Sequence, residues 1–396
     1  SITPTYTVGN GSVMTMASGG TLTLSVAQDP AAALVVGNTT ANVGQFTAKA
    51  TNEGVDMKFF GLTISSPDGG IDVGANDFNM VDSLELYEGN TLLGSVTVNS
   101  ANATITPSGG QVTLAVNQER VLTVKAKFKD VSTPSAATSG GGMKVTLSHV
   151  EATGTSAGSS SVTISGLNNA FKTFSSFKSI PTVSMSSITA DQIVGSTAVV
   201  DLMKFSVSAN SAGPILLGKF TFGISSSTSV VLSSTGFYLY QSDSSGSLGS
   251  ILSNTGDMQV VINAGSNTGE AVAARFDVND DSSVASDGVD EGEHFQINAG
   301  STKYFTFKGT LSAISATAND DSISTVLAGD AAFATTSATN FAGVDGTNTG
   351  NDDFIWSDYN FNLASTGRAT PTNGWFNGYR VSGLPDASST PQTQTD

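Results

Sequence analysis

Apolar and polar residues alternate in short runs over most of this chain. Residues 44–50, 57–65 and 83–87 are typical of these runs, and each is flanked within two residues by Gly, Asn, Asp, Ser or Pro. Strict alternation over four to eight residues is the pattern of a strand with one buried face. Helical periodicity is almost absent, so we predict an all-β chain.

One strand–turn–strand pattern, at residues 83–95, occurs a second time at residues 235–250. Leu86 and Tyr87 correspond to Leu239 and Tyr240, both at an offset of 153 residues. The flanking runs also match, with Phe46 in the place of Phe205 and residues 122–125 in the place of residues 305–308. A repeat of this kind indicates two related domains in tandem.

The strands are short, are spaced by about 8–12 residues and have turn residues between them, which favours an immunoglobulin-like β-sandwich over a barrel or a propeller. We expect an N-terminal extension at 1–19, a first β-sandwich at 20–178, a second at 179–385 and a polar tail at 386–396. No Gly/Ser-rich or Pro-rich spacer separates the two units, so we expect stiff coupling between them.

The N-terminal extension has no counterpart in the repeat. Residues 2–8 alternate strictly, with Ile2, Tyr6 and Val8 on one face of a strand, and residues 13–16 form a second run that carries Met14 and Met16. An exposed sheet edge accepts such a strand from a neighbouring chain. These five side chains are therefore candidate subunit contacts, and the alternative is that the strand folds back on its own first domain.

Charge and cysteine content narrow the possible chemistry. The chain has no cysteine, which excludes disulfides, zinc–thiolate sites and thiol nucleophiles. Its formal net charge of −17 disfavours nucleic acid and anionic membrane surfaces as partners. No apolar run has the roughly 20 residues that a membrane helix needs. The first residues lack the pattern of a signal peptide, so an exported form of this sequence would begin after processing.

The densest cluster of acidic residues lies between positions 277 and 293. Seven carboxylates fall within these 17 residues, in a stretch where the second unit has 28 residues more than the first. Ser282 and Gly288 stand where an EF-hand loop needs Gly and Glu, so the segment is not an EF-hand. Two interpretations stay open, a solvated acidic loop and a structural calcium site. The candidate calcium ligands are Asp277, Asn279, Asp281, Asp287, Asp290 and Glu291.

No catalytic constellation stands out, and we expect the protein not to be an enzyme. His149 and His294 are 145 residues apart, in different repeats, and assemble neither a metal triad nor a Ser-His-Asp set. Aromatic residues that could stack on sugar rings are expected to pack in the core instead. They are Tyr238, Tyr240, Trp356, Tyr359, Trp375, Phe376 and Tyr379. Asn10, Asn38 and Asn102 begin glycosylation sequons, so glycan attachment is a further possibility.

The end of the second unit carries a family resemblance. Residues 353–358 (Asp-Phe-Ile-Trp-Ser-Asp), with residues 373–379 and 383–385, resemble the closing segment of secreted immunoglobulin-like repeat surface proteins, of S-layer or filament type, from ultrasmall candidate-phyla (Patescibacteria) bacteria. Residues 86–89 resemble their recurrent hairpin. The resemblance implies an extracellular, cell-surface location, and it carries over no catalytic residue.

Three classes of function remain. The tandem sandwiches, the weakly charged composition and the extra strand favour a structural subunit that assembles with copies of itself into an extracellular filament or surface layer. The aromatic residues alone support a cell-surface adhesin or carbohydrate-binding module. No specific feature supports a secreted hydrolase.

Overall fold

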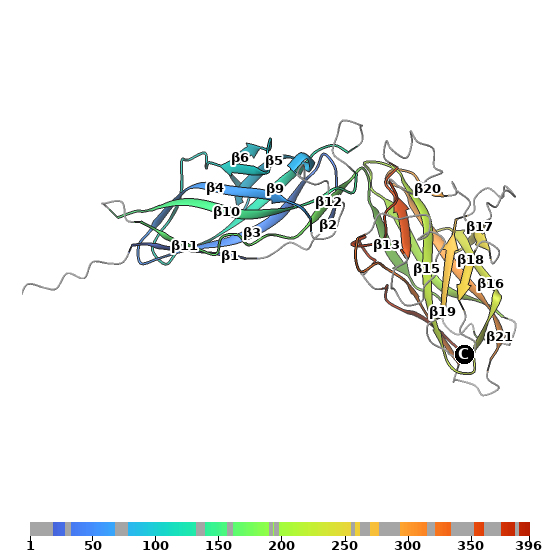
Figure 1. Ribbon diagram of the computed structural model, residues 1–396. Helices are drawn as coiled ribbons and strands as arrows, with labels where there is room; N and C mark the ends of the chain where they lie inside the picture. Colours follow the sequence, from blue (N-terminus) through green and yellow to red (C-terminus); the bar gives the residue numbers. More distant parts are fainter. Residues whose placement is uncertain are drawn as a thin grey trace, which may run out of the picture.

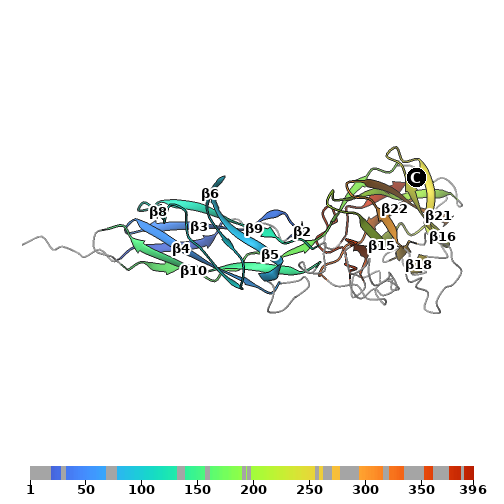
Figure 2. The ribbon, with the colours of Figure 1, turned by 90° about the horizontal axis from the view of Figure 1, so that it is seen from above.

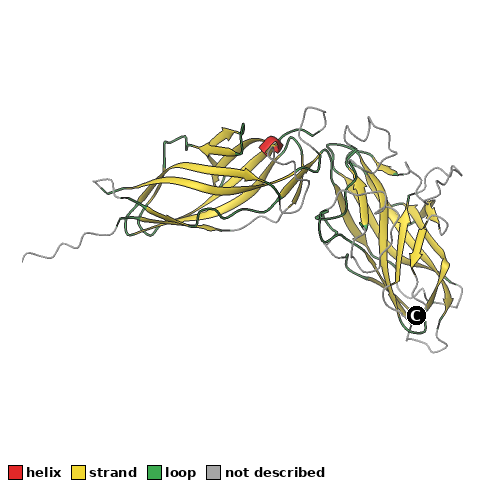
Figure 3. Cartoon of the chain, in the orientation of Figure 1, coloured by secondary structure: helices red, strands yellow, loops and turns green. Residues whose placement is uncertain are grey.

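The structure is a computed structural model. It describes residues 19–27, 33–67, 78–131, 139–156, 161–189, 193, 198–254, 258–261, 270–276, 294–314, 321–333, 352–359, 374–384 and 388–396. The candidate donor strand at 1–18 and the acidic segment at 277–293 lie outside these residues. Strands make up most of the described chain, and loops and turns connect them (Figure 3). None of its helices is long and apolar enough to span a membrane.

The described chain folds into two β-sandwiches that follow one another along an elongated molecule (Figures 1 and 2). The predicted all-β fold with two tandem immunoglobulin-like sandwiches is therefore confirmed. Each sandwich encloses its own apolar core. The second core is rich in stacked and edge-on phenylalanines, among them Phe205, Phe220 and Phe305.

The first sandwich has two six-stranded sheets. One contains, in spatial order, β11 (Thr163–Ser165), β1 (Thr21–Val26), β3 (Thr40–Thr51), β9 (Glu119–Phe128), β5 (Val81–Glu88) and β6 (Thr91–Thr97). The other contains β2 (Ala33–Val36), β12 (Phe174–Phe177), β10 (Gly142–Gly154), β4 (Val55–Ser65) and β7 (Asn102–Ile105), with β8 (Val112–Leu114) also on β4.

The second sandwich repeats this plan. Its first sheet contains β13 (Pro181–Ser186), β14 (Val199–Ala209), β21 (Thr302–Ala313), β16 (Val231–Ser242) and β17 (Leu248–Asn254). Its second sheet contains β18 (Met258–Val261), β19 (Glu270–Arg275), β15 (Ile215–Ser226), β22 (Ser322–Leu327) and β24 (Gln392–Thr395), with β20 (Phe295–Ile297) and β23 (Phe354–Ser357) also on β15.

The strand register reproduces the repeat that the sequence predicts. Phe46 lies opposite Leu122 in the first sandwich, and Phe205 lies opposite Phe305 in the second. The matching hairpins are β5–β6 and β16–β17. The first turns at Gly89, whose φ of 55° suits glycine. The second turns around Asp243, whose carboxylate accepts hydrogen bonds from the backbone of Ser245 and Ser247.

A second repeated motif is not among those that the sequence comparison finds. Ser-Gly-Leu occurs at residues 165–167 and again at 382–384, each time beside the first strand of a sandwich. Gly166 and Gly383 have φ values of 82° and 79°. A Cβ at either glycine would lie within 1.8 Å of a carbonyl oxygen in β1 or β13. Only glycine allows this approach, so both sandwiches use the same close glycine contact beside their first strand.

The predicted polar tail at 386–396 is wrong, because β24 completes a sheet of the second sandwich by pairing with β22. Its glutamine side chains hydrogen-bond backbone groups of β14 and of the segment that follows β13. Gln392 Nε2 donates to the carbonyl of Lys204, and Gln394 Nε2 donates to those of Thr189 and Asp201. A segment that is polar in composition is thus fixed by amide hydrogen bonds and not by apolar packing.

Candidate functional site: the joint and the open surfaces

The joint between the sandwiches is built on β12. All four residues of this strand are buried, and its backbone pairs with β2 and β10 of the first sandwich. Phe174 packs in the first core, whereas the ring of Phe177, at the other end of the strand, packs in the second core. The backbone carbonyl of Phe177 accepts a hydrogen bond from Gly37 in the first sandwich. One residue therefore belongs to both domains.

The second sandwich receives Phe177 in an aromatic pocket. Its ring lies 5.0 Å from that of Trp356 and 4.9 Å from that of Phe376, the latter edge-on. Trp356 and Phe376 exchange two backbone hydrogen bonds, and the Trp356 indole donates to the carbonyl of Asn377 at 2.9 Å. Edge-on ring pairs of this kind add to the free energy gained by burial.

A buried carboxylate adds a polar connection beside the rings. Asp358, fully buried, accepts a hydrogen bond from the backbone N–H of Lys178 at 2.8 Å and another from the hydroxyl of Ser139. The Lys178 ammonium donates to the carbonyl of Tyr359 at 3.0 Å. Across the same boundary, Arg380 makes a long hydrogen bond to the Thr173 carbonyl. Several segments of the first sandwich are thus tied to the second.

Asp330 holds the receiving pocket together. One of its carboxylate oxygens accepts from the backbone N–H of Asp353, and the other accepts from Phe354 and Gly378. Burial, with a contribution from nearby Asp352, raises the pKa of Asp330 to about 6, while the three N–H donors oppose the rise. This carboxylate links β23 to the segment that carries Phe376.

The motif at residues 353–358 and 374–384 is therefore part of the joint and not an isolated closing segment. Sequence reasoning missed this role because β22 and β23, which pair with successive stretches of β15, are separated by residues 328–353. Two signals were available in the sequence. Both tryptophans of the chain lie in this motif, and Phe171, Phe174 and Phe177 recur every third residue at the domain boundary.

The aromatic residues considered for a sugar platform divide into two groups. Trp356, Trp375 and Phe376 are buried, as the core interpretation expects. Tyr359 and Tyr379 are partly buried, and Tyr238 and Tyr240 are only half-buried, so the expectation of core packing is wrong for Tyr238 and Tyr240. Their rings, 6.3 Å apart, lie on the outer face of the first sheet of the second sandwich.

That outer face differs between the two sandwiches. In the second sandwich, Tyr240 lies beside Ile251 on β17. Asp201 on this face pairs with two lysines, Lys308 and, at 2.8 Å, Lys204. The equivalent face of the first sandwich is charged. There the Lys125 ammonium lies 4.0 Å from the centre of the Tyr87 ring, and the Tyr87 hydroxyl donates a hydrogen bond to Glu85. The second sandwich therefore presents the more apolar face.

The remaining sequence candidates do not come together. His149 is exposed on β10, and His294 lies in the other sandwich just before β20. Asn38 and Asn102 are both exposed, so these two sequons are accessible, whereas Asn10 lies outside the described residues. No group of three or more His, Cys, Asp or Glu side chains among the described residues is arranged to hold a metal ion. The donor residues (Ile2, Tyr6, Val8, Met14, Met16) and the candidate calcium ligands (Asp277, Asn279, Asp281, Asp287, Asp290, Glu291) lie outside the described residues.

No protein-family model and no curated protein matches this chain. Among solved structures, the C-terminal domain of the Streptococcus agalactiae antigen I/II polypeptide BspA is similar at 10% identity, over 77% of this chain and 95% of that one, with a TM-score of 0.22. The C-terminal domain of Streptococcus pyogenes AspA follows at 12% identity, 79% and 96% coverage and a TM-score of 0.21. The Staphylococcus aureus collagen adhesin has 11% identity, 79% and 87% coverage and a TM-score of 0.17. Similarity at this level carries no argument about function.

Replacing Phe177 with alanine is expected to destabilise the second sandwich by about 3–5 kcal/mol, because the variant empties an aromatic site in its core. Both tryptophans lie in the second sandwich, so thermal unfolding followed by tryptophan fluorescence reports that domain. Phe174→Ala is the matched control, since it removes the same side chain from the first core. An equal loss of the tryptophan-detected transition in both variants would contradict the separate assignment of the two rings.

The raised pKa of Asp330 predicts that the stability of the second sandwich depends on pH. Its pKa in the folded protein, about 6, lies above that of an unfolded aspartate, so its stabilising contribution is largest below about pH 4 and is lost as the pH rises through 6. The change amounts to about 3 kcal/mol in the free energy of unfolding. Urea unfolding followed by tryptophan fluorescence between about pH 3.5 and pH 7.5 measures it. Asp330→Asn, which does not titrate, is expected to show a flatter profile, and an unchanged profile would rule out Asp330 as its origin.

Proposed function

We propose that this chain is a non-catalytic structural subunit that assembles with copies of itself into an extracellular filament or surface layer. The observation that carries the proposal is the joint, in which the Phe177 ring of one sandwich completes the core of the other. Two sandwiches fixed in this way form one elongated unit that transmits force along its length and keeps its two ends in a fixed relative orientation. A repeating assembly needs a subunit of this kind.

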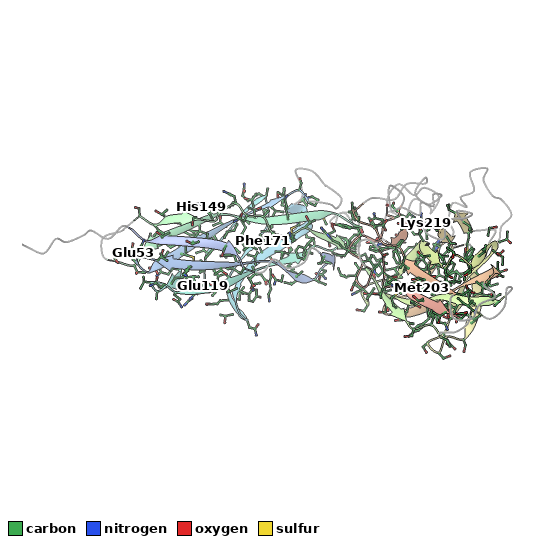
Figure 4. All side chains as sticks on the ribbon, turned by 90° about the horizontal axis from the view of Figure 1, so that it is seen from below. Glu53, Glu119, His149, Phe171, Met203 and Lys219 are labelled. Atoms are coloured by element: carbon green, nitrogen blue, oxygen red, sulfur yellow. The ribbon has the colours of Figure 1, made fainter. Side chains whose placement is uncertain are left out.

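Assembly proceeds by donation of the N-terminal strand. Gly20, from which residues 1–19 continue, contacts Glu53 at the end of the first sandwich that is farthest from the second (Figure 4). An arm that leaves from one end of an elongated subunit reaches the next subunit more readily than its own second sandwich. A head-to-tail contact of this type does not close on itself and therefore propagates.

The family resemblance at residues 353–358, 373–379 and 383–385 supports an extracellular, cell-surface setting. The partners in this proposal are other copies of the chain, and the accessible Asn38 and Asn102 are positions for glycan attachment.

Deleting residues 1–19 is expected to abolish polymer formation and to leave a folded monomer, because the deletion removes the donated strand and no residue of either described core. Negative-stain microscopy of the full-length and truncated proteins measures the polymers, and circular dichroism of both verifies the fold. If the truncated protein forms the same polymers as the full-length chain, strand donation is wrong.

A second function, a cell-surface adhesin or carbohydrate-binding module, is favoured by one observation. Tyr238 and Tyr240 hold two partly exposed rings side by side on an outer sheet face, on strands next to Lys204 and Lys308, which share the one carboxylate of Asp201 and so leave a net positive charge. Aromatic rings on a flat surface stack on sugar rings, and neighbouring lysines pair with acidic groups. An acidic glycan is the ligand that this face fits best.

The adhesin alternative predicts that a glycan array detects binding to acidic glycans and that Tyr238→Ala/Tyr240→Ala removes it. The half-exposed rings are not part of the core, so the double variant is expected to keep the unfolding transition of the parent. Tyr87→Ala, on the equivalent strand of the first sandwich, is the matched control and is expected to bind as the parent does. Equal binding by all three proteins contradicts the platform.

A further inference from the structure

We infer that the outer edge of β17 in the second sandwich is the acceptor for residues 2–8 of a second copy of the chain. The inference rests on the proposed function, because it identifies the surface on which the donated strand docks. On one side β17 pairs with β16, and no strand of the described chain pairs with its other side. An edge of this kind presents a row of backbone N–H and C=O groups that another strand can pair with.

The usual protections of an edge strand are missing from β17. Natural edges carry charged residues or proline, or are very short. β17 has seven residues, and residues 244–256 around it contain neither a charge nor a proline. Two of its large apolar side chains are solvent-exposed, Leu248 to 46% and Ile251 to 50%. The strand is therefore both open and apolar on its outer side.

The other sheet edges of the described chain are shorter or partly covered. β6, the counterpart of β17 in the first sandwich, accepts a backbone hydrogen bond from Ser108 at Leu93. β13 receives Ser382 along its edge, and β24 receives Ile193. The edge strands β2, β7 and β18 have four residues each, and β11 has three. This comparison singles out β17.

Electrostatics favour the same pairing. Two copies that each carry a net charge of −17 repel one another, so contact requires surfaces without acidic groups. The donor meets this condition, because the first charged residue of the chain is Asp29. The acceptor meets it as well, and Lys204 and Lys308 lie on the adjoining face with Asp201 as their acidic partner. An uncharged arm on an uncharged edge avoids the like-charge repulsion.

Chain length excludes pairing within one molecule. The 12 residues from 9 to 20 reach at most about 40 Å when fully extended. The first sandwich is about as long as β10, which has 13 residues and spans about 43 Å at the usual rise per residue. β17 lies beyond it, at the margin of the second sandwich that faces away from the first (Figure 1). A strand on β17 must therefore come from another copy.

The side chains of the donor match this position. In an extended strand, Tyr6 and Val8 share one face, and Thr5 and Thr7 share the other. Pairing beside β17 places that apolar face next to Ile251, which already lies opposite Tyr240. The row of apolar side chains on the outer face of the sheet then continues into the donated strand. Aromatic and aliphatic neighbours across strands stabilise such pairs.

The absence of cysteine makes the contact testable by disulfide cross-linking in the full chain. One preparation carries Tyr6→Cys and the other Ile251→Cys, and the two are mixed under polymerising conditions and oxidised. We expect a disulfide-linked dimer of the two variants on a non-reducing gel. Leu92→Cys on β6 is the matched control acceptor, because Leu92 is similarly exposed at 46% and occupies the equivalent hairpin position. No such dimer is expected with it.

The outcomes separate this inference from the proposed function. If Tyr6→Cys cross-links to Leu92→Cys instead of Ile251→Cys, β17 is not the acceptor. The same holds if it cross-links to neither variant while deletion of residues 1–19 still abolishes polymers. Both outcomes are compatible with strand donation. Polymers that persist after the deletion overturn the proposed function itself. Ile251→Lys provides a second measurement, because a charged edge residue is expected to cause loss of polymers while Leu92→Lys does not.

Discussion

The burial of one phenylalanine across a domain boundary sets the organisation of this protein. Phe177 keeps its backbone in a sheet of the first sandwich and places its ring among Trp356 and Phe376 of the second. Neither core is complete without the chain segment that joins them. The boundary therefore behaves as an interior, with close-packed rings and a buried carboxylate, and its geometry is fixed by packing and not by the length of a linker.

Much of the fold could be predicted from the sequence, because alternation and repetition are local signals. The correspondence of Phe46 with Phe205 and of Leu86 with Leu239 matches the observed registers. The joint could not be derived in the same way. Trp356 meets Phe177 only because it pairs in β23 with Leu217 of β15, 139 residues earlier in the chain, and such long-range pairing leaves no periodic pattern. β24 was mistaken for a tail because its glutamines are held by amide hydrogen bonds to backbone groups, which composition does not reveal.

Charge imposes a second constraint. The acidic residues outnumber the basic ones by 33 to 16, so most of the molecular surface repels another copy. Residues 1–28 and 244–256 carry no charge, and they lie at the start of the chain and on an edge of the second sandwich. Contact through uncharged stretches such as these avoids the repulsion, which limits the ways in which two molecules can touch.

The direction of the terminal strands has a mechanical consequence. β1 runs from the far end of the first sandwich toward the joint, and β24 runs from the joint side of the second sandwich toward its far end. Tension applied along the molecule through these strands pulls each one parallel to its own axis. All six residue pairs between β1 and β3 are then loaded together in shear, and cannot be peeled apart one at a time. A subunit built in this way bears load through whole ladders of hydrogen bonds, with the aromatic joint in series between them.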